Sequence, residues 1–253
     1  MRKRKKSVVV WLTLNGAIKL ALSALLVVLV VFIYSYELPA TTKTWTDWTL
    51  PLSGKTIALD AGHGGPDGGA ASKEGLVEKG INLAITLYLR DYLQQAGAIV
   101  VMTREEDKDL ANEGTKGYSR RKTEDLLNRA EFVSKNKSNL FISVHLNSIP
   151  SAKWRGAQTF YYPNHPDNAI LASLIQGEIK RNLENTDRVA KPADKTVYLL
   201  QTLKIPSALV EVGFLSNPEE AALLSNEIYQ KKIAASIYQG ILRYYSGEKV
   251  GSL

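Results

Sequence analysis

The chain has 253 residues, of which 45% are hydrophobic and 23% are charged. This composition is that of a globular protein with one sizeable core, and it excludes wholesale disorder. The formal charge is +7, but residues 1–40 hold six basic residues against one acidic residue, a net +5, which leaves only +2 for residues 41–253. Because the basicity is confined to the N-terminus, we expect no binding to nucleic acid. Cysteine is absent, which excludes disulfides and thiol catalysis.

The N-terminus combines a basic cluster with a long apolar run. Residues 2–6 are all basic, and Leu20–Tyr36 is interrupted only by two serines. A helix over this run spans about 26 Å, close to the ~30 Å hydrocarbon core of a bilayer. The basic cluster should stay in the cytoplasm, so we predict that residues 1–36 form a basic stub and a membrane anchor. A cleavable signal peptide is the alternative, but residues 37–39 offer no small residues before a cut.

The remaining sequence predicts a linker, one folded domain and a short tail. Residues 37–52 contain Thr, Trp and Pro without a hydrophobic period, which is typical of a linker. Residues 53–246 alternate short apolar runs with helical patterns and are predicted to form one domain. Residues 247–253 are predicted to be a tail. We find no internal repeat of roughly 20–50 residues, so no repeat architecture is expected.

Strands and helices are predicted to alternate along this domain. Strands are expected at residues 55–60, 99–103, 140–146, 158–162, 197–200 and 208–212. Helices are expected at residues 78–96, around 126–133, at 169–183, from Asn217 onward and at 227–245. Residues 104–125 are charged and contain glycine, which predicts a long loop or a short helical insertion. The alternation predicts an α/β domain whose helices flank a largely parallel sheet.

A glycine-rich loop follows the first predicted strand. It reads Asp60-Ala-Gly-His-Gly-Gly65 and lies where α/β folds place their sites. A phosphate-binding loop is excluded because no Lys-Ser/Thr pair follows and no helix starts at once. His63 is therefore a candidate ligand, although a solvated loop histidine would have the same local sequence.

Two further candidates have ordinary structural explanations as well. Glu78 opens a predicted helix, where an acidic side chain is favoured by the helix dipole whatever its function. His145 lies at the end of the LFISVHL strand, and strand alternation predicts that Phe141, Ser143, His145 and Asn147 share one face. A core histidine satisfied by the backbone is the alternative for His145, and the neighbouring Asn147 makes that alternative less attractive.

Glu211 is an acidic residue inside an apolar strand. A buried, unpaired carboxylate costs several kcal/mol, roughly, so Glu211 must pair with a cation, meet a metal site or be protonated. No Lys or Arg lies beside it in the sequence, which favours a functional role over a structural ion pair. Two histidines and one glutamate make a catalytic zinc set, and a second glutamate can then act as general base. The third histidine, His165, lies in a polar turn and is expected at the surface.

Four motifs in this order resemble the zinc-dependent N-acetylmuramoyl-L-alanine amidases. They are LDAGHGGPDGGA (59–70), Glu78 with the helix after it, LFISVHLNS (140–148) and ALVEVGFLSNPEE (208–220). The resemblance implies that residues 53–246 are the catalytic domain, an amidase type 3 fold of the phosphorylase/hydrolase-like kind with a mixed sheet of about six strands. It further implies that His63, Glu78 and His145 bind Zn²⁺ and that Glu211 is the catalytic glutamate. The implied substrate is peptidoglycan, cut between the lactyl group of muramic acid and L-alanine.

A narrower resemblance is to the amidases of spore-forming bacilli that act on the spore cortex. It is carried by residues 50–69, by TKGYSRRKTEDL (115–126) and by RNLENT (181–186). It implies formation of muramic lactam together with a separate muramic acid deacetylase. The implied location is the outer face of the cytoplasmic membrane or outside the cell, including the space between the spore membranes.

Several points stay open at the level of sequence. Asn147 and Asp60 are expected to contact substrate or to support the ligands. Gln201 stands where many amidases of this kind have arginine, and the insertion 112–124 is longer than in most of them, so both bear on the cleft. A general cell-wall amidase, a zinc peptidoglycan carboxypeptidase and an inactive wall-binding protein remain alternatives.

Overall fold

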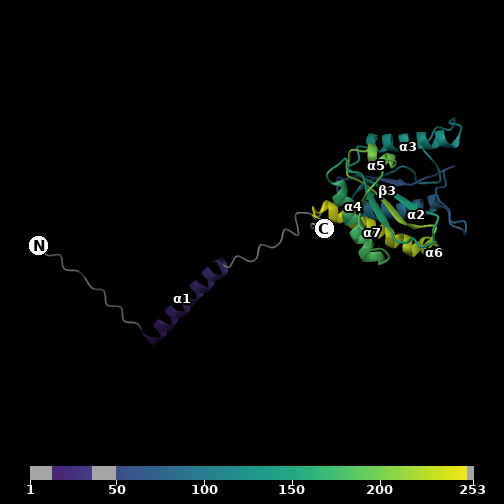
Figure 1. Cartoon of the computed structure of the whole chain (residues 1–253). Helices are drawn as coiled ribbons and strands as arrows, with labels where there is room; N and C mark the ends of the chain where they lie inside the picture. The colour runs from purple at the N-terminus through teal and green to yellow at the C-terminus, as the bar shows by residue number, and fades with distance from the viewer. Residues whose placement is uncertain (1–12, 36–49, 250–253) are drawn as a thin grey trace. The chain divides into compact units, whose positions relative to one another are not determined.

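The computed structural model describes residues 13–35 and 50–249 (Figure 1). The chain divides into two compact units, Met1–Trp48 and Thr49–Leu253. In the first unit, α1 (Leu14–Ser35) confirms the predicted apolar helix, and its span Leu14–Phe32 is long and apolar enough to cross a membrane. The basic cluster of the predicted stub, most of the predicted linker and the last residues of the predicted tail lie outside the described residues.

The second unit is built on the predicted mixed sheet of six strands. The strands are β1 (Thr56–Ala61), β2 (Ile99–Met102), β3 (Leu140–Asn147), β4 (Gln158–Tyr161), β5 (Lys191–Pro192) and β6 (Ser207–Phe214). Their order across the sheet is β2-β1-β3-β6-β4-β5. Strands β2, β1, β3 and β6 are parallel to one another, β4 is antiparallel to β6, and β5 is parallel to β4. The central strands are apolar on both faces because helices cover both.

The helices form two unequal layers (Figure 1). The larger layer consists of α2 (Glu78–Gln95), α4 (Asn168–Leu183) and α7 (Glu227–Tyr245), which share the larger hydrophobic core with the sheet. The smaller layer consists of α3 (Tyr118–Lys135) and α5 (Tyr198–Thr202), which pack on the opposite face. The short α6 (Pro218–Leu224) begins as predicted, because the Asn217 side chain accepts hydrogen bonds from two backbone N–H groups of its first turn.

Alternation along the central strands decides which side chains face the smaller layer. On β3, Ile142 packs in the larger core and Phe141 in the smaller one. Because side chains alternate with a period of two, Ser143 and His145 lie on the same face as Phe141. The predicted common face therefore holds for these three residues, whereas the register of β3 with β6 shifts between His145 and Asn147.

The same rule applies to the strands on either side of β3. Ala58 of β1 and Leu209 of β6 both belong to the smaller core. Two residues further along each strand, Asp60 and Glu211 therefore face the same layer. Parallel strands end at a common edge of the sheet, so these polar side chains gather at the carboxyl ends of β1, β3 and β6.

Two sequence-based assignments are wrong and one is resolved. Residues 197–200 were expected to form a strand, but Tyr198–Thr202 is the helix α5. A short apolar run looks the same for a buried strand and for one buried helical turn, so periodicity does not distinguish them. The two-residue strand β5 was missed because its residues are exposed and charged or proline. Within 104–125, the last residues are helical, because α3 already begins at Tyr118.

Candidate metal centre

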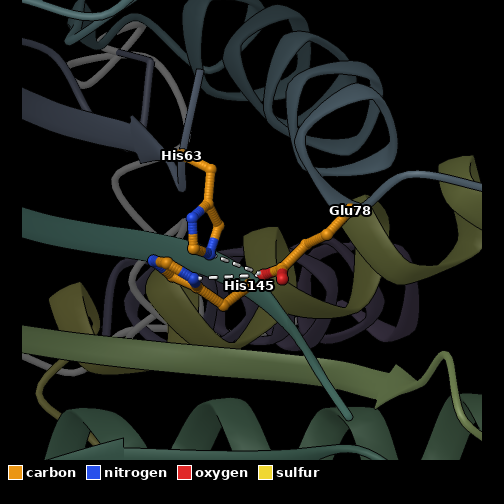
Figure 2. A group of neighbouring side chains, drawn as sticks. All are labelled: His63, Glu78 and His145. Atoms are coloured by element: carbon orange, nitrogen blue, oxygen red, sulfur yellow. Dashed lines mark hydrogen bonds and ion pairs between the residues drawn. The ribbon is translucent and has the colours of Figure 1, made fainter. Parts of the chain in front are cut away.

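Three side chains converge at the carboxyl edge of the sheet (Figure 2). His63 comes from the loop after β1, Glu78 is the first residue of α2, and His145 lies near the end of β3. His63 Nε2 and His145 Nδ1 lie 3.2 Å and 3.3 Å from the same oxygen, Glu78 Oε1. The donor atoms of the three residues all lie within 4.8 Å of one another. Two imidazole nitrogens and one carboxylate oxygen at this spacing are a donor set suited to zinc.

Two glycines let the three candidate ligands approach so closely. A Cβ at Gly62 would overlap the imidazole ring of His145, and one at Gly69 would collide with the carboxylate of Glu78. Gly69 also has a φ of +69°, which side chains rarely adopt. His63 itself has a φ of +63°, so the loop holds a non-glycine residue in the left-handed region at the site.

The carboxylate of Glu78 is held in its charged form. Its Oε2 accepts a hydrogen bond from Ala70 N at 2.8 Å, and its Oε1 accepts one from Leu146 N at 2.9 Å. Burial acts to raise the pKa of Glu78, but hydrogen bonds from His145 and His63 hold it well below its ordinary value. A ligand carboxylate must be deprotonated to bind a metal ion, and Glu78 meets this condition.

Glu211 lies beside this cluster without belonging to it. It is the register partner of His145 on the neighbouring strand β6. Its Oε2 is buried and has no hydrogen-bond partner among the described residues. Burial raises the pKa of Glu211 to about 7, the nearby charge of Glu78 adds to this rise, and the histidines oppose it. The residue is half-buried, and a buried carboxylate oxygen without a partner is unusual in a folded protein and typical of a functional group.

Asp60, which was expected to support the site, contacts a buried arginine that holds the loop after β1. This loop, residues 61–69, carries His63 and is called the ligand loop below. Its carboxylate accepts hydrogen bonds from Ser143 Oγ at 2.6 Å and from Arg129 at 2.7 Å. Arg129 in turn donates to the carbonyl oxygens of Ala61 at 3.0 Å and His63 at 2.7 Å. Burial opposes ionisation, but the charges of Arg129 and His145 hold the pKa of Asp60 at about 2.

A second buried arginine, which the sequence analysis did not select, holds the same loop. Arg104 is 1% exposed and follows β2 in the segment 104–125. Its guanidinium donates to the carbonyl oxygens of Ala61 at 2.8 Å and Gly62 at 2.9 Å, and to that of Lys79 at 2.8 Å. The sequence carried no signal for its role, because a charged segment predicts solvated side chains.

Asp67 is a further residue near the cluster that could not be selected from the sequence. Its Oδ2 lies 2.9 Å from Nδ1 of His63, four residues earlier in the loop. Burial acts to raise the pKa of Asp67, but hydrogen bonds from His63 and Lys122 hold it well below its ordinary value. The one sequence signal was its place in the same glycine-rich loop as His63.

A cavity of about 280 Å³ lies beside the cluster. It is lined by polar side chains, among them His63, His145 and Glu211, and by apolar side chains of the smaller helical layer, among them Leu126 and Leu199. An elongated substrate with polar and apolar parts can therefore contact both the candidate ligands and the helices α3 and α5.

Three residues considered in the sequence analysis lie outside the lining of this cavity. Asn147 ends β3, and its backbone carbonyl accepts a hydrogen bond from Leu215 N at 2.9 Å. Gln201 is an exposed residue of α5. His165 is partly buried and its Nδ1 accepts a hydrogen bond from Asp167 N at 3.2 Å, so it does not join the cluster.

Comparison with known proteins agrees with this geometry. The sequence matches the family model described as N-acetylmuramoyl-L-alanine amidase over residues 57–243. The germination-specific N-acetylmuramoyl-L-alanine amidase of Bacillus subtilis (strain 168) is 54% identical over 219 residues, which are 87% of this chain and 91% of that protein. The amidase CwlD from Clostridioides difficile, solved in complex with the GerS lipoprotein, has 47% identity and a TM-score of 0.74, and the match covers 77% of this chain and 100% of that one.

A more distant relative shares the same fold. The amidase AmiC2 of Nostoc punctiforme has 29% identity and a TM-score of 0.65, over 77% of this chain and 99% of that one. The matched family region runs from β1 into α7 and so contains every residue of the candidate metal centre. The family resemblance seen in the sequence motifs is confirmed. The chain therefore belongs to the N-acetylmuramoyl-L-alanine amidase family and is a cell-wall amidase.

Proposed function

We propose that the protein is a zinc-dependent hydrolase that cuts the amide between the lactyl group of N-acetylmuramic acid and L-alanine in peptidoglycan. One observation carries this proposal: the donor cluster His63, Glu78 and His145 lies beside the half-buried Glu211, whose Oε2 is buried and has no hydrogen-bond partner among the described residues. The activity is assigned to residues 53–246. Metal-assisted hydrolysis of an amide needs a metal-binding cluster and a free general base beside it.

The donor set fits a catalytic zinc ion. Catalytic zinc sites use three protein ligands and keep one position open, and two His with one Glu is a common combination. His63, Glu78 and His145 would hold the ion. When bound, zinc supplies Lewis acidity, which activates water and polarises the amide carbonyl.

The proton transfers are assigned to Glu211. Its free Oε2 accepts a proton from the attacking water, and the same oxygen then delivers the proton to the departing nitrogen of L-alanine. Both transfers need a carboxylate oxygen that lies next to the proposed ligands and is not engaged elsewhere, and Oε2 of Glu211 satisfies both conditions. Asp60 and Arg129 contribute by holding the backbone of the ligand loop.

We expect recognition of a sugar–peptide junction and not of bulk negative charge, because residues 41–253 carry a net charge of only +2. Digestion of purified peptidoglycan, followed by mass analysis, tests this. The expected products are intact stem peptides that begin with L-alanine and a glycan chain that stays unbroken. New reducing sugar ends would identify a glycosidase, and release of D-alanine alone would identify a carboxypeptidase. If the protein is folded but releases no product, the result would favour an inactive wall-binding protein.

A role in the spore cortex is proposed on the similarity to the germination-specific amidase of Bacillus subtilis. The enzyme would strip the peptide from muramic acid so that a separate deacetylase can act next and muramic lactam can form. A lipoprotein partner is a further possibility of the same kind, since the CwlD amidase forms a complex with the GerS lipoprotein. Spores of cells that lack the protein should contain no muramic lactam. A normal lactam content would limit the function to general wall hydrolysis.

The N-terminal segment is proposed to keep the enzyme at the outer face of the membrane. Its support is the length and apolar composition of α1 together with the basic residues before it. The full-length chain should fractionate with membranes and be accessible to external protease. A mature protein whose sequence starts near Thr41 would instead mean a cleaved signal peptide and a secreted enzyme.

A further inference from the structure

We propose that Asp67 is the positioning residue that orients the ring of His63 toward the metal, and that Tyr118 and Lys122 of α3 hold Asp67 in that position. The inference rests on the proposed zinc chemistry of the site. It gives a role to the first turns of α3, which belong to the insertion 112–124. This insertion would then act on the metal centre as well as on the shape of the cleft.

The carboxylate of Asp67 contacts the ring of His63. A deprotonated carboxylate only accepts hydrogen bonds, so Nδ1 of His63, 2.9 Å from Asp67 Oδ2, must carry the ring proton. With Nδ1 committed to Asp67, the nitrogen that would give up its proton to a metal ion is Nε2, which faces Glu78 Oε1 from 3.2 Å. Asp67 therefore selects both the tautomer and the orientation that a metal-binding His63 needs.

The backbone of the loop fixes Asp67 relative to His63. Gly64 N donates to the carbonyl oxygen of Asp67 at 2.9 Å, and Asp67 N donates to that of Gly64 at 3.1 Å. The side chain is also tied down, because Oδ1 accepts a hydrogen bond from Gly69 N at 3.1 Å. The loop thus turns back on itself, and this turn brings a carboxylate against the ring of a residue four positions earlier.

The carboxylate of Asp67 also contacts α3. Lys122 Nζ lies 2.9 Å from Asp67 Oδ2, and the Tyr118 hydroxyl donates to Asp67 Oδ1 at 2.9 Å. The two residues stand four positions apart on α3, so they face the loop together from one side of the helix. The Asp67 side chain is only 13% exposed. Lys122 places a positive charge beside its carboxylate, and Tyr118 donates a hydrogen bond to it.

No other acidic side chain in the described part of the chain duplicates this role. The contacts of His63 and His145 with carboxylates are those with Glu78 and the one between His63 and Asp67. Loss of Asp67 should therefore leave Nδ1 of His63 without an acidic partner. The cavity beside the cluster is also lined by Asp67 and Lys122, so a substrate that enters it contacts the same pair.

The test measures the dissociation constant for zinc of the purified full chain, by competition with a chromophoric chelator. Asp67→Asn and Asp67→Ala should each weaken zinc binding by about 10- to 100-fold, the usual cost of losing such a supporting carboxylate. The matched control is Asp107→Asn. Asp107 contacts the same loop through Gly65 N at 2.9 Å but does not touch His63. Equal losses in the control and in Asp67→Asn would overturn the proposal, because the effect would then be general to the loop.

The contribution of α3 needs a conservative variant that keeps the fold. Tyr118→Phe removes one hydroxyl from a side chain that is 57% exposed, and it should weaken zinc binding by about 2- to 5-fold. Lys122→Met should do the same or more. In the Asp67→Ala background both substitutions should have no further effect, because their action passes through Asp67. Losses that simply add in that background would refute the assignment to α3.

The outcomes separate this inference from the proposed function. A wild-type chain that binds no zinc would refute the zinc-dependent mechanism itself. A wild-type chain that binds zinc tightly, with unchanged affinity in Asp67→Asn, would refute only the role of Asp67.

Discussion

Glu211→Gln is expected to lower turnover of peptidoglycan by about 10²- to 10⁴-fold while the protein keeps its zinc. The substitution preserves the shape of the side chain and removes the ability of Oε2 to take up a proton. The three donor side chains are untouched, because Glu211 is not part of the cluster that could hold the ion. Elemental analysis and digestion of peptidoglycan, performed on the same preparation, measure the two quantities together.

Two matched variants show whether the division of labour between ligands and base is correct. His145→Ala removes a donor atom and should lose both the zinc and the activity. Glu219→Gln changes the charge of an 84% exposed side chain and should change neither. If Glu211→Gln lost its zinc as His145→Ala does, Glu211 would be a ligand and the proposed roles would be wrong.

Arg129→Met is expected to lower the free energy of unfolding by about 3–5 kcal/mol. The guanidinium is 2% exposed and donates to Asp60 at 2.7 Å and to Asp125 at 2.8 Å. Its removal leaves two nearly buried carboxylates without their cation, and it also leaves the carbonyl oxygen of His63 without this donor. Unfolding in urea, followed by circular dichroism, measures the loss.

The control for this variant is Arg120→Met, on the same helix. Arg120 is exposed, so its replacement should change the unfolding free energy by no more than about 0.5 kcal/mol. A loss below about 1 kcal/mol for Arg129→Met would mean that the buried network rearranges without cost. It would then not hold the ligand loop in the way that its hydrogen bonds indicate.

Much of the candidate site could be predicted from the sequence because its residues follow apolar strands. The alternation of strands and helices predicted a parallel arrangement, and parallel strands place their carboxyl ends on one edge. His63, His145 and Glu211 stand at or near those ends. Glu78 is the first residue of α2, the helix that follows β1 in the chain. The chemistry of zinc and the cost of burying Glu211 then pointed to a shared site.

The residues that support the ligands could not be found in this way. Arg104 lies 43 positions from Ala61, one of the residues whose carbonyls it contacts, and Arg129 lies 66 positions from His63. In the sequence both stand in charged, helical or loop-like segments, where solvated side chains are the ordinary expectation. The short apolar run at 197–200 was mistaken for a strand for a related reason, since a single buried turn has too few residues to show its period.

The sequence by itself thus determined the alternating fold and the apolar N-terminal helix, and it predicted the four polar residues of the candidate site. These depend on local patterns of hydrophobicity and on the fixed geometry of parallel strands. Only the tertiary structure decided that Asp60 acts through Arg129, that Asn147 lies outside the cavity lining, and that Asp67 faces both His63 and α3. The contacts of Arg129 and of α3 join segments that are distant in the chain, and they form because α3 packs on the sheet beside the loop that carries His63. Arg129 is buried there, where hydrogen bonds with protein groups must replace those with water.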